Sequence, residues 1–485
     1  MVRTRLAPSP TGKVHIGNFR TALFDYFLAR QSGGQFLLRI EDTDQERLVP
    51  GAIEYLLRMF KALGITPDEG PVLQEDGTIT EVGSCGPYYQ SARLDIYKQH
   101  AKELVEKGLA YPCFCTVERL DEMRKAQTAL KQTTKYDRKC LSLTKTEAEE
   151  RMMGGEGCVI RIKVPEGSTT FCDAIRGDIT FDNSEVDDCI ILKSDGFPTY
   201  YLAATVDDQL MSISHVLRGE EWISSTPKSL LLCKMFGWKA PIFAHVPLLL
   251  GSDKKKLSKR TGDTAVEEYF NHGYLKEALI NFVGTLGFNP SADQEIFTIE
   301  ELIEKFDLSK VNSAGAILNM EKLDWMNRHY LMALSIEQLA ERAQGFVSAD
   351  LTNILVQRAL FVERSRVSRL TDFDVAIAPY LALLPYDASI LVWKKADAAD
   401  ASAHLQRILT LLTDIDENIF GTVDLLEAAI KEYITREGMQ NGNTLWPLRV
   451  ALSGQEKSAT PFEVLWVLGK EESLRRIEHA IAVLQ

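Results

Sequence analysis

Two short stretches of the chain carry residues that could bind and activate a phosphate group. Residues 8–18, PSPTGKVHIGN, contain His15, which can donate a hydrogen bond to a phosphate oxygen, and Gly17, which permits close approach of the backbone. Far downstream, the run Lys256-Leu257-Ser258-Lys259-Arg260 gathers three cations behind a turn. Such cations suit a triphosphate, because they stabilise the negative charge that grows on a leaving pyrophosphate.

The elements around both stretches are those that position phosphate ligands in α/β proteins. An alternating run at residues 2–7 predicts a strand, and residues 19–31 predict an amphipathic helix. Residues 8–18 would then be the loop that presents backbone N–H groups and a helix N-terminus to an anion. The basic run follows an apolar, strand-like segment at residues 242–250. Ligands of open α/β sheets lie at the carboxyl ends of strands, so both stretches are expected at one cleft.

These stretches carry a family resemblance. His15-Ile16-Gly17-Asn18 and the later lysine run, in this order, resemble the HIGH and KMSKS signatures of class I aminoacyl-tRNA synthetases. Four further segments look like bacterial-type glutamyl-tRNA synthetases: RTRLAPSPTG at 3–12, RIEDTD at 39–44, PTYYLA at 198–203 and VLRGEEW at 216–222. The resemblance covers the whole chain and is densest over the first 330 residues.

The resemblance implies a fold and a reaction. The fold is a doubly wound Rossmann-type catalytic domain with an inserted acceptor-binding subdomain, followed by a helical anticodon-binding domain. The expected parts are 1–110 and 196–327 for the two catalytic halves, 111–195 for the insertion and 328–485 for the helical domain. The reaction joins L-glutamate to its tRNA through glutamyl-adenylate, made from ATP, and then transfer to the 3′-terminal ribose. Some members of the family also charge the tRNA for glutamine.

The resemblance also assigns residues to the two substrates. For ATP, accompanied by Mg²⁺ without dedicated protein ligands, it implies His15, Gly17, Lys256 and Lys259 at the phosphates, and Glu221 and Leu249 at the adenosine. For glutamate it implies Arg5, Ala7, Ser9, Glu41, Tyr200, Ala204 and Arg218. An arginine can grip a carboxylate with two parallel N–H bonds, and a glutamate can hold the substrate ammonium. Which arginine meets which carboxylate stays open, and Ala204 replaces an asparagine of several relatives.

The cysteines and the tail suggest two more sites. Cys113, Cys115 and Cys140 indicate a structural zinc, since thiolates favour tetrahedral Zn²⁺, and the resemblance implies Tyr136 as the fourth ligand. The other five cysteines are expected to be reduced thiols. In the tail, the segment around Arg449 resembles the family segment near the anticodon, where an arginine could contact phosphate, stack on a base or serve the fold.

Composition narrows the class of protein. At 485 residues, two or more domains are expected. A net charge of −13 argues against a broadly basic nucleic-acid binder, although a local basic stripe suffices for tRNA. No apolar run approaches the roughly 18 residues that a membrane-spanning helix needs. The chain begins without a signal-peptide pattern, so a cytoplasmic protein is expected, and a monomer is usual for the family.

Other classes of protein are less consistent with these residues. A glutaminyl-tRNA synthetase is disfavoured by the PSPTG run and by the helical tail, and a short glutamyl-queuosine synthetase lacks such a tail. A nucleotidylyltransferase acting on a small molecule would explain the first loop and the acidic charge, but not the tail. A non-catalytic binding protein has no support, because His15, Lys256 and Lys259 are all present.

Periodicity predicts the remaining elements. Strands are expected at 36–40 and 215–218, helices at 51–63 and 91–107, and a loop at 68–87. The insertion should contain short strands at 158–164, 169–173, 179–181 and 189–193. Beyond residue 330, helices are expected at 336–346, 352–367, 405–412, 423–436 and 461–484.

Overall fold

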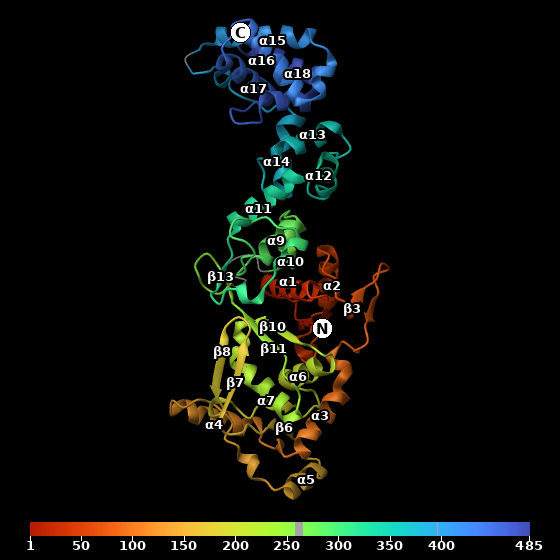
Figure 1. The fold of residues 1–485 in the computed structure, drawn as a ribbon. Helices are drawn as coiled ribbons and strands as arrows, with labels where there is room; N and C mark the ends of the chain where they lie inside the picture. Colours follow the sequence, from red (N-terminus) through yellow and green to blue (C-terminus); the bar gives the residue numbers. More distant parts are fainter. Residues whose placement is uncertain (258–264, 395) are drawn as a thin grey trace. The chain divides into compact units, whose positions relative to one another are not determined.

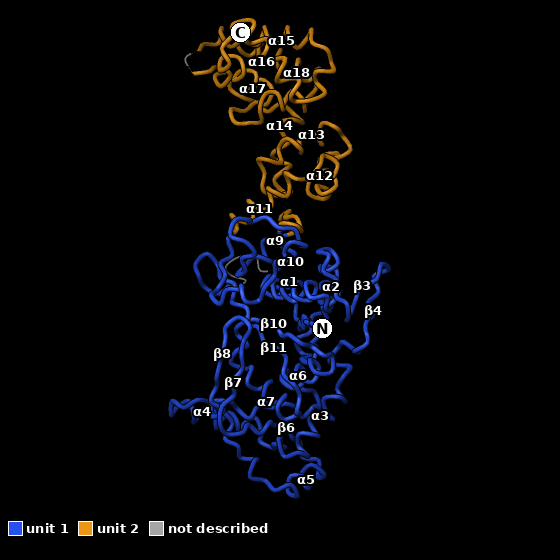
Figure 2. The backbone as a smooth tube through the Cα atoms, in the orientation of Figure 1, with its two compact units in different colours: residues 1–269, 279–319 blue, residues 270–278, 320–485 orange. Residues whose placement is uncertain are grey.

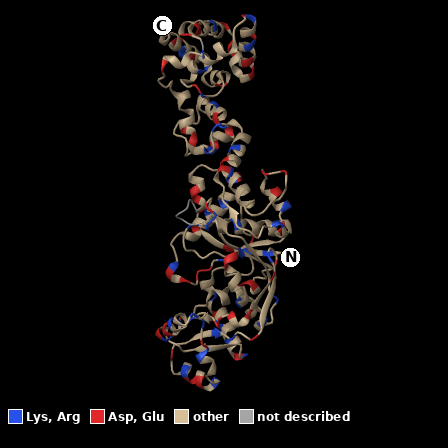
Figure 3. Cartoon of the chain, turned by 90° about the vertical axis from the view of Figure 1, so that its left-hand side faces the viewer, with Lys and Arg blue, Asp and Glu red and all other residues tan. Residues whose placement is uncertain are grey.

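The computed structural model describes residues 1–257, 265–394 and 396–485. It divides into two compact units, residues 1–269 with 279–319 and residues 270–278 with 320–485 (Figure 2). Among the described residues, no helix is both long enough and apolar enough to cross a membrane. Lysine and arginine are interspersed with aspartate and glutamate on both units in the view of Figure 3.

Parallel strands and their covering helices form the centre of the first unit. Strand β1 (Arg3–Leu6) pairs with β2 (Gln35–Leu38), and β10 (His215–Gly219) pairs with β11 (Ile242–Val246), both in parallel. The two pairs meet where the Ser214 N–H donates to the Arg3 carbonyl. Helix α1 (Ile16–Gln31) packs on β1, β2 and β10, while α6 (Tyr200–Leu210) and α7 (Thr226–Phe236) lie on the other side (Figure 1). The predicted doubly wound core is confirmed.

The first loop is shorter than predicted. Helix α1 begins at Ile16 rather than at residue 19, because the His15 side chain caps the helix by accepting the Gly17 N–H. Gly17 therefore lies in the first helical turn and not in the loop. The helix is also buried on more than one side: the polar Arg20 and Asp25 are buried along with Phe24, so α1 lacks the exposed polar face of the predicted amphipathic helix. Residues 68–87, predicted as a loop, contain the hairpin of β3 (Gly70–Leu73) and β4 (Ile79–Val82).

The inserted region has a small antiparallel sheet and a hairpin. β5 (Ala110–Cys113), β6 (Val159–Ile162) and β9 (Ile190–Leu192) form the sheet, and β7 (Ser168–Asp173) pairs with β8 (Gly177–Asp182). The predicted strands are confirmed within one or two residues. Helices α4 (Val117–Ala129) and α5 (Lys145–Met153) were missed; α4 buries none of its residues, so no apolar periodicity marks it.

Shorter elements complete the first unit. They are α2 (Ala52–Leu63), which ends at Gly64 as predicted, α3 (Leu94–Glu106), β12 (Leu249–Leu250), α10 (Ile299–Lys305) and β13 (Ala316–Ile317). The apolar run at 242–250 is two strands rather than one, with Pro247 between them. Helices α8 (Val266–Asn271) and α9 (Lys276–Gly284) span the division between the units.

The second unit is helical, as predicted. Its helices are α11 (Met320–Ala333), α12 (Ile336–Arg342), α13 (Ile354–Glu363), α14 (Phe373–Leu381), α15 (Ala398–Asp414), α16 (Val423–Arg436), α17 (Asn441–Ser453) and α18 (Pro461–Val483). Helix α16 has the predicted bounds, whereas α15 begins seven residues before the expected 405. Arg449 lies half-buried on α17.

Candidate active site

Two adjoining cavities open at the carboxyl ends of the parallel strands. The first, of about 280 Å³, is lined by six of the seven residues predicted to bind glutamate. The second, of about 250 Å³, is lined by the predicted ATP residues that the structure describes. Both share four lining residues and so form one cleft: Asn18, Thr21, Gly219 and Glu221. The first cavity includes Arg5, Ala7, Ser9, Glu41, Tyr200 and Arg218, and the second includes His15, Gly17, Glu221, Leu249 and Lys256.

Two predicted residues are not among those that line the two cavities. Ala204 lines a smaller hollow behind the first cavity, together with Tyr200 and Arg218, so it does not face the main space. Lys259 lies outside the described residues. Of the basic run, Lys256 and Leu257 are described; Lys256 is exposed and makes an isolated bridge to Leu250.

Arg218, at the end of β10, is held by neutral groups alone. Its Nε donates to His245 Nε2 at 3.1 Å, Nη1 to the Tyr200 hydroxyl at 3.1 Å, and Nη2 to Thr226 Oγ1 at 2.7 Å. The residue is 8% exposed, and none of the described carboxylates pairs with it. A guanidinium has five N–H donors, so one N–H remains on each Nη nitrogen. The first cavity thus presents a nearly buried cation that has two spare donors and no ion-pair partner among the described residues.

Arg5 is bound into a charged network beneath the same cavity. Its Nε lies 3.0 Å from Asp208 Oδ1, which also accepts from Arg39 Nη1 at 2.7 Å. Arg39 in turn donates to Glu41 Oε1 at 3.0 Å. Asp207, beside Asp208 on α6, binds Arg93. A substrate could therefore contact Arg5 only while Asp208 also binds it. Arg218, in contrast, has no carboxylate partner among the described residues.

Burial and pairing set the protonation of this network. Burial raises the pKa of Glu41, and the attraction of Arg39 only partly offsets it. For Asp208, burial would also raise the pKa, but Arg5 and Arg39 outweigh it and the pKa lies below its ordinary value. Burial would lower the pKa values of Arg5 and Arg39, but the neighbouring acidic groups, with Asp208 the strongest of them, together outweigh it and raise both. The network is therefore ionised at Asp208 and both arginines.

The second cavity is built around the start of α1. His15 Nδ1 accepts the Gly17 N–H at 3.0 Å, so a neutral His15 carries its proton on Nε2, where it can donate to a phosphate. A Cβ on residue 17 would lie 3.2 Å from that ring nitrogen, so a larger residue there would press on the capping imidazole. Behind them Arg20 donates to the carbonyl of Pro247. Burial lowers the pKa of Arg20 to about 10, so it stays a cation at neutral pH.

Sequence reasoning missed several residues of the cleft. Arg39 lies in the RIEDTD segment but had no role assigned, and its partner Asp208 is distant in sequence. Arg20 sits in a helix that reads as ordinary core. His245 lies in the apolar segment at 242–250, which predicts a strand but does not indicate a polar role for it. The missed residues that touch a predicted one or line the cleft include Asn18, Arg20, Thr21, Arg39, Asp208, Trp222, Thr226 and His245.

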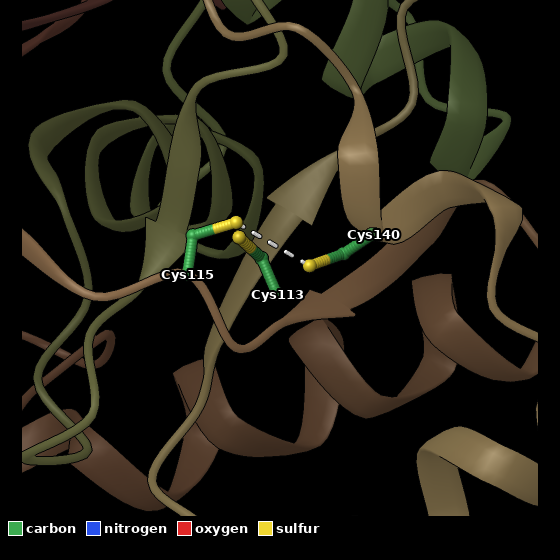
Figure 4. A group of neighbouring side chains, drawn as sticks. All are labelled: Cys113, Cys115 and Cys140. Carbon is green, nitrogen blue, oxygen red and sulfur yellow. Dashed lines mark hydrogen bonds between the residues drawn. The ribbon is translucent and has the colours of Figure 1, made fainter. Parts of the chain in front are cut away.

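The predicted cysteine cluster is brought together by the structure. The sulfurs of Cys113, Cys115 and Cys140 all lie within 4.8 Å of one another (Figure 4). The Tyr136 hydroxyl is 3.4 Å from Cys113 Sγ and 3.3 Å from Cys115 Sγ. In a tetrahedral zinc site with Zn–S bonds of about 2.3 Å, ligand sulfurs are about 3.8 Å apart. The three sulfurs are therefore close enough together to share one zinc ion, and the Tyr136 hydroxyl lies beside them.

The fold and the cleft define a class of protein. Parallel strands, a histidine-capped helix with a glycine in its first turn, a lysine opposite and a helical second unit together are those of a class I aminoacyl-tRNA synthetase. The family model described as tRNA synthetases class I (E and Q), catalytic domain, matches residues 1–325, and the one described as anticodon binding domain matches residues 338–481.

Individual relatives narrow the class. Glutamate–tRNA ligase of Clostridioides difficile (strain 630) is 42% identical over 99% of this chain and 98% of its own, and that of Clostridium botulinum (strain Eklund 17B) is 44% identical over 100% and 99%. The crystal structure of a glutamate tRNA ligase from Elizabethkingia meningosepticum, in complex with its amino acid, superposes with a TM-score of 0.87 at 32% identity and covers both chains fully. The chain belongs to the glutamate–tRNA ligase family.

Proposed function

We propose that the protein attaches L-glutamate to tRNA(Glu) in two steps, with the first cavity holding glutamate and the second holding ATP. The observation that carries the glutamate assignment is Arg218, a nearly buried cation without a carboxylate partner among the described residues. Leaving such a charge unpaired is costly, so the cavity favours an anionic ligand group. Glu41, which accepts from Arg39 at 3.0 Å, lines the same cavity and would hold the substrate ammonium.

In the first step the α-carboxylate of glutamate attacks the α-phosphorus of ATP, and pyrophosphate leaves. His15 donates from Nε2 to a phosphate oxygen, and Gly17 lets the ligand approach the start of α1. Lys256, and Lys259 from the part of the basic run outside the described residues, stabilise the charge on the leaving pyrophosphate. Mg²⁺ bound to ATP would neutralise part of the phosphate charge.

In the second step a terminal ribose hydroxyl of tRNA attacks the acyl carbon of glutamyl-adenylate, and AMP leaves. No side chain of the protein forms a covalent intermediate in this scheme. The acceleration comes from holding the reacting groups in line and from stabilising charge. Arg218 contributes by fixing the glutamate side chain while the α-carboxylate faces the second cavity.

Charge then explains why glutamate is preferred to glutamine. A glutamine amide would leave Arg218 facing an uncharged group in a nearly dry pocket. An unpaired buried charge costs about 3–5 kcal/mol, which corresponds to a discrimination of roughly 10²- to 5 × 10³-fold. Tyr200 and Thr226 cannot supply the missing charge, because both are neutral hydroxyls.

The proposed function is tested by exchange and charging assays. With ATP and tRNA(Glu) present, we expect glutamate to support ATP–pyrophosphate exchange, and glutamine and aspartate to support it at least about 100-fold less well. We expect purified tRNA(Glu) to be charged, and parallel reactions with tRNA(Gln) show whether a second tRNA is accepted. Exchange driven by glutamine as well as by glutamate would refute the role of Arg218 and the proposed specificity.

We propose a structural zinc for the cysteine cluster as well. Arg119 Nη1 lies 3.4 Å from Cys115 Sγ, and the Arg161 guanidinium stacks on the Tyr136 ring at 4.0 Å. These two cations would stabilise the negative charge of thiolate ligands. We expect about one zinc per chain in protein purified without chelator, measured by elemental analysis. Cys113→Ser should lose the metal, whereas Cys172→Ser, an exposed cysteine of the same region, should retain it. Metal-free wild-type protein with an unchanged melting temperature would contradict the proposal.

Three further assignments complete the proposal. The second unit would bind the anticodon arm, with Arg449 as one contact on α17. The protein would act as a monomer. It would work in the cytoplasm, where tRNA is charged for protein synthesis.

A further inference from the structure

A buried chain of hydrogen bonds runs from the inserted hairpin to the Arg218 guanidinium. Asp173, the last residue of β7, has its Oδ2 2.6 Å from His245 Nδ1. His245 lies on β11, and its Nε2 accepts from Arg218 Nε at 3.1 Å. The side chains of Asp173 and His245 are both fully inaccessible to solvent. The hairpin lies beside β10 and β11 (Figure 1), and its Ala174 N–H donates to the Phe243 carbonyl.

The geometry allows only one tautomer of His245. Arg218 Nε is a donor without a lone pair, so His245 Nε2 must accept and cannot carry a proton. The proton of the imidazole therefore lies on Nδ1 and is donated to Asp173. Burial lowers the pKa of His245, and Arg218 lowers it further against the opposing effect of Asp173, which keeps the ring neutral. Thr226 Oγ1 also lies 3.1 Å from His245 Nε2, but its hydroxyl can donate to the Trp222 carbonyl at 3.0 Å and so leave the Nε2 lone pair to Arg218.

Asp173 is itself fixed by its own turn. Its Oδ1 accepts the backbone N–H groups of Ile175 and Arg176 at 3.0 and 3.1 Å. The backbone N–H of His245 lies 3.3 Å from Oδ1 and 3.2 Å from Oδ2. Burial alone would raise its pKa, but the bonds from His245 and the backbone outweigh it and the pKa lies below its ordinary value. The carboxylate is ionised, has one position, and serves as an acceptor only.

We propose that Asp173 is a positioning residue for amino-acid recognition: through the tautomer of His245 it orients Arg218 toward the side-chain carboxylate of the substrate. This inference rests on the proposed function and extends it to a residue of the inserted hairpin. A carboxylate placed directly on Arg218 would also orient it, but would satisfy its charge. Because the imidazole of His245 separates Asp173 from Arg218, Asp173 can orient the guanidinium without forming an ion pair with it. The charge of Arg218 is then available to pair with the substrate.

Replacing Asp173 with asparagine tests the tautomer. The asparagine oxygen would stay with the turn N–H groups of Ile175 and Arg176, and its NH₂ would face His245 Nδ1. The ring would then carry its proton on Nε2, opposite the Arg218 Nε–H, as happens when a histidine-orienting carboxylate becomes an amide. We expect the KM for glutamate in exchange assays with tRNA(Glu) to rise roughly 10- to 100-fold, and the KM for ATP to stay within about twofold.

Two substitutions of His245 separate positioning from packing. His245→Asn keeps a donor toward Asp173 but removes the acceptor for Arg218, so it should raise the KM for glutamate as Asp173→Asn does. His245→Gln places an amide oxygen near the Nε2 position, where it can accept from Arg218, and should recover most of the affinity. Asp178→Asn, an exposed residue on β8 of the same hairpin, is the matched control and should leave both KM values unchanged.

A readout independent of activity comes from ¹⁵N NMR of the imidazole rings, with His245 assigned from the His245→Asn spectrum. Wild-type His245 should be the neutral Nδ1–H tautomer, and Asp173→Asn should convert it to Nε2–H. Absence of glutamate-dependent exchange in wild-type protein would refute the proposed function, while the tautomer change would still report on the inference. An unchanged tautomer in Asp173→Asn, or equal rises of both KM values, would overturn the inference.

Discussion

Replacing Arg218 with glutamine is expected to lower kcat/KM for glutamate by about 10²- to 10³-fold or more, with little change in the KM for ATP. Arg218 is the cation of the first cavity that no described carboxylate neutralises, and its three hydrogen-bond partners are neutral. A glutamine side chain can still reach some of these partners but supplies no charge. The loss should therefore appear against glutamate and not against ATP, measured by pyrophosphate exchange at varied concentrations of each substrate.

Two variants control this experiment. Arg218→Lys keeps the charge but loses the planar donor array that binds Tyr200, Thr226 and His245 together, so we expect intermediate activity. Arg58→Gln alters an exposed arginine on α2 and should behave as wild type. If Arg218→Gln activated glutamate as well as wild type does, Arg218 would not be the residue that recognises the substrate anion.

The residues of the cleft that could be predicted from sequence are those that lie in contiguous signatures. His15 and Gly17 lie at the start of α1, Glu41 follows β2 and Arg218 lies near the end of β10, so their placement follows from where strands end and the first helix begins. Only the boundary was wrong there, since a histidine N-cap is not a usual start signal and the helix begins three residues early. The structure brings these residues together in one cleft; their roles stay predictions.

The residues that sequence could not supply act through partners far along the chain. The sequence around Asp208 carries no motif that indicates a site, and only the fold places this carboxylate between Arg5 and Arg39. Asp173 ends a short strand of the insertion, and nothing near it in sequence indicates His245. Helix α4 was not predicted for a related reason. None of its residues is buried, so its sequence has no apolar periodicity from which a helix could be predicted. Pairing at long range is a property of the fold.

Replacing Asp208 with asparagine is expected to lower the stability of the first unit by about 3–5 kcal/mol, because it leaves two buried arginines without their shared carboxylate. Arg39 is fully buried and Arg5 is 4% exposed, so water cannot replace the lost partner. In a unit of this size the midpoint of thermal unfolding should fall by about 5–10 °C. Asp121→Asn, which breaks the exposed Asp121–Arg124 pair, should change stability by less than about 0.5 kcal/mol.

The pH dependence of this difference follows from the protonation of Asp208. Its pKa in the folded protein lies below the ordinary value, so its pairing contributes stability that is complete above the unfolded pKa of about 3.9. That contribution is lost as the pH falls through the folded pKa. The gap in melting temperature between wild type and Asp208→Asn should therefore be widest near neutral pH and shrink below about pH 4. A gap that widened on acidification, or no gap at pH 7, would mean that Asp208 does not hold Arg5 and Arg39 as a charged pair.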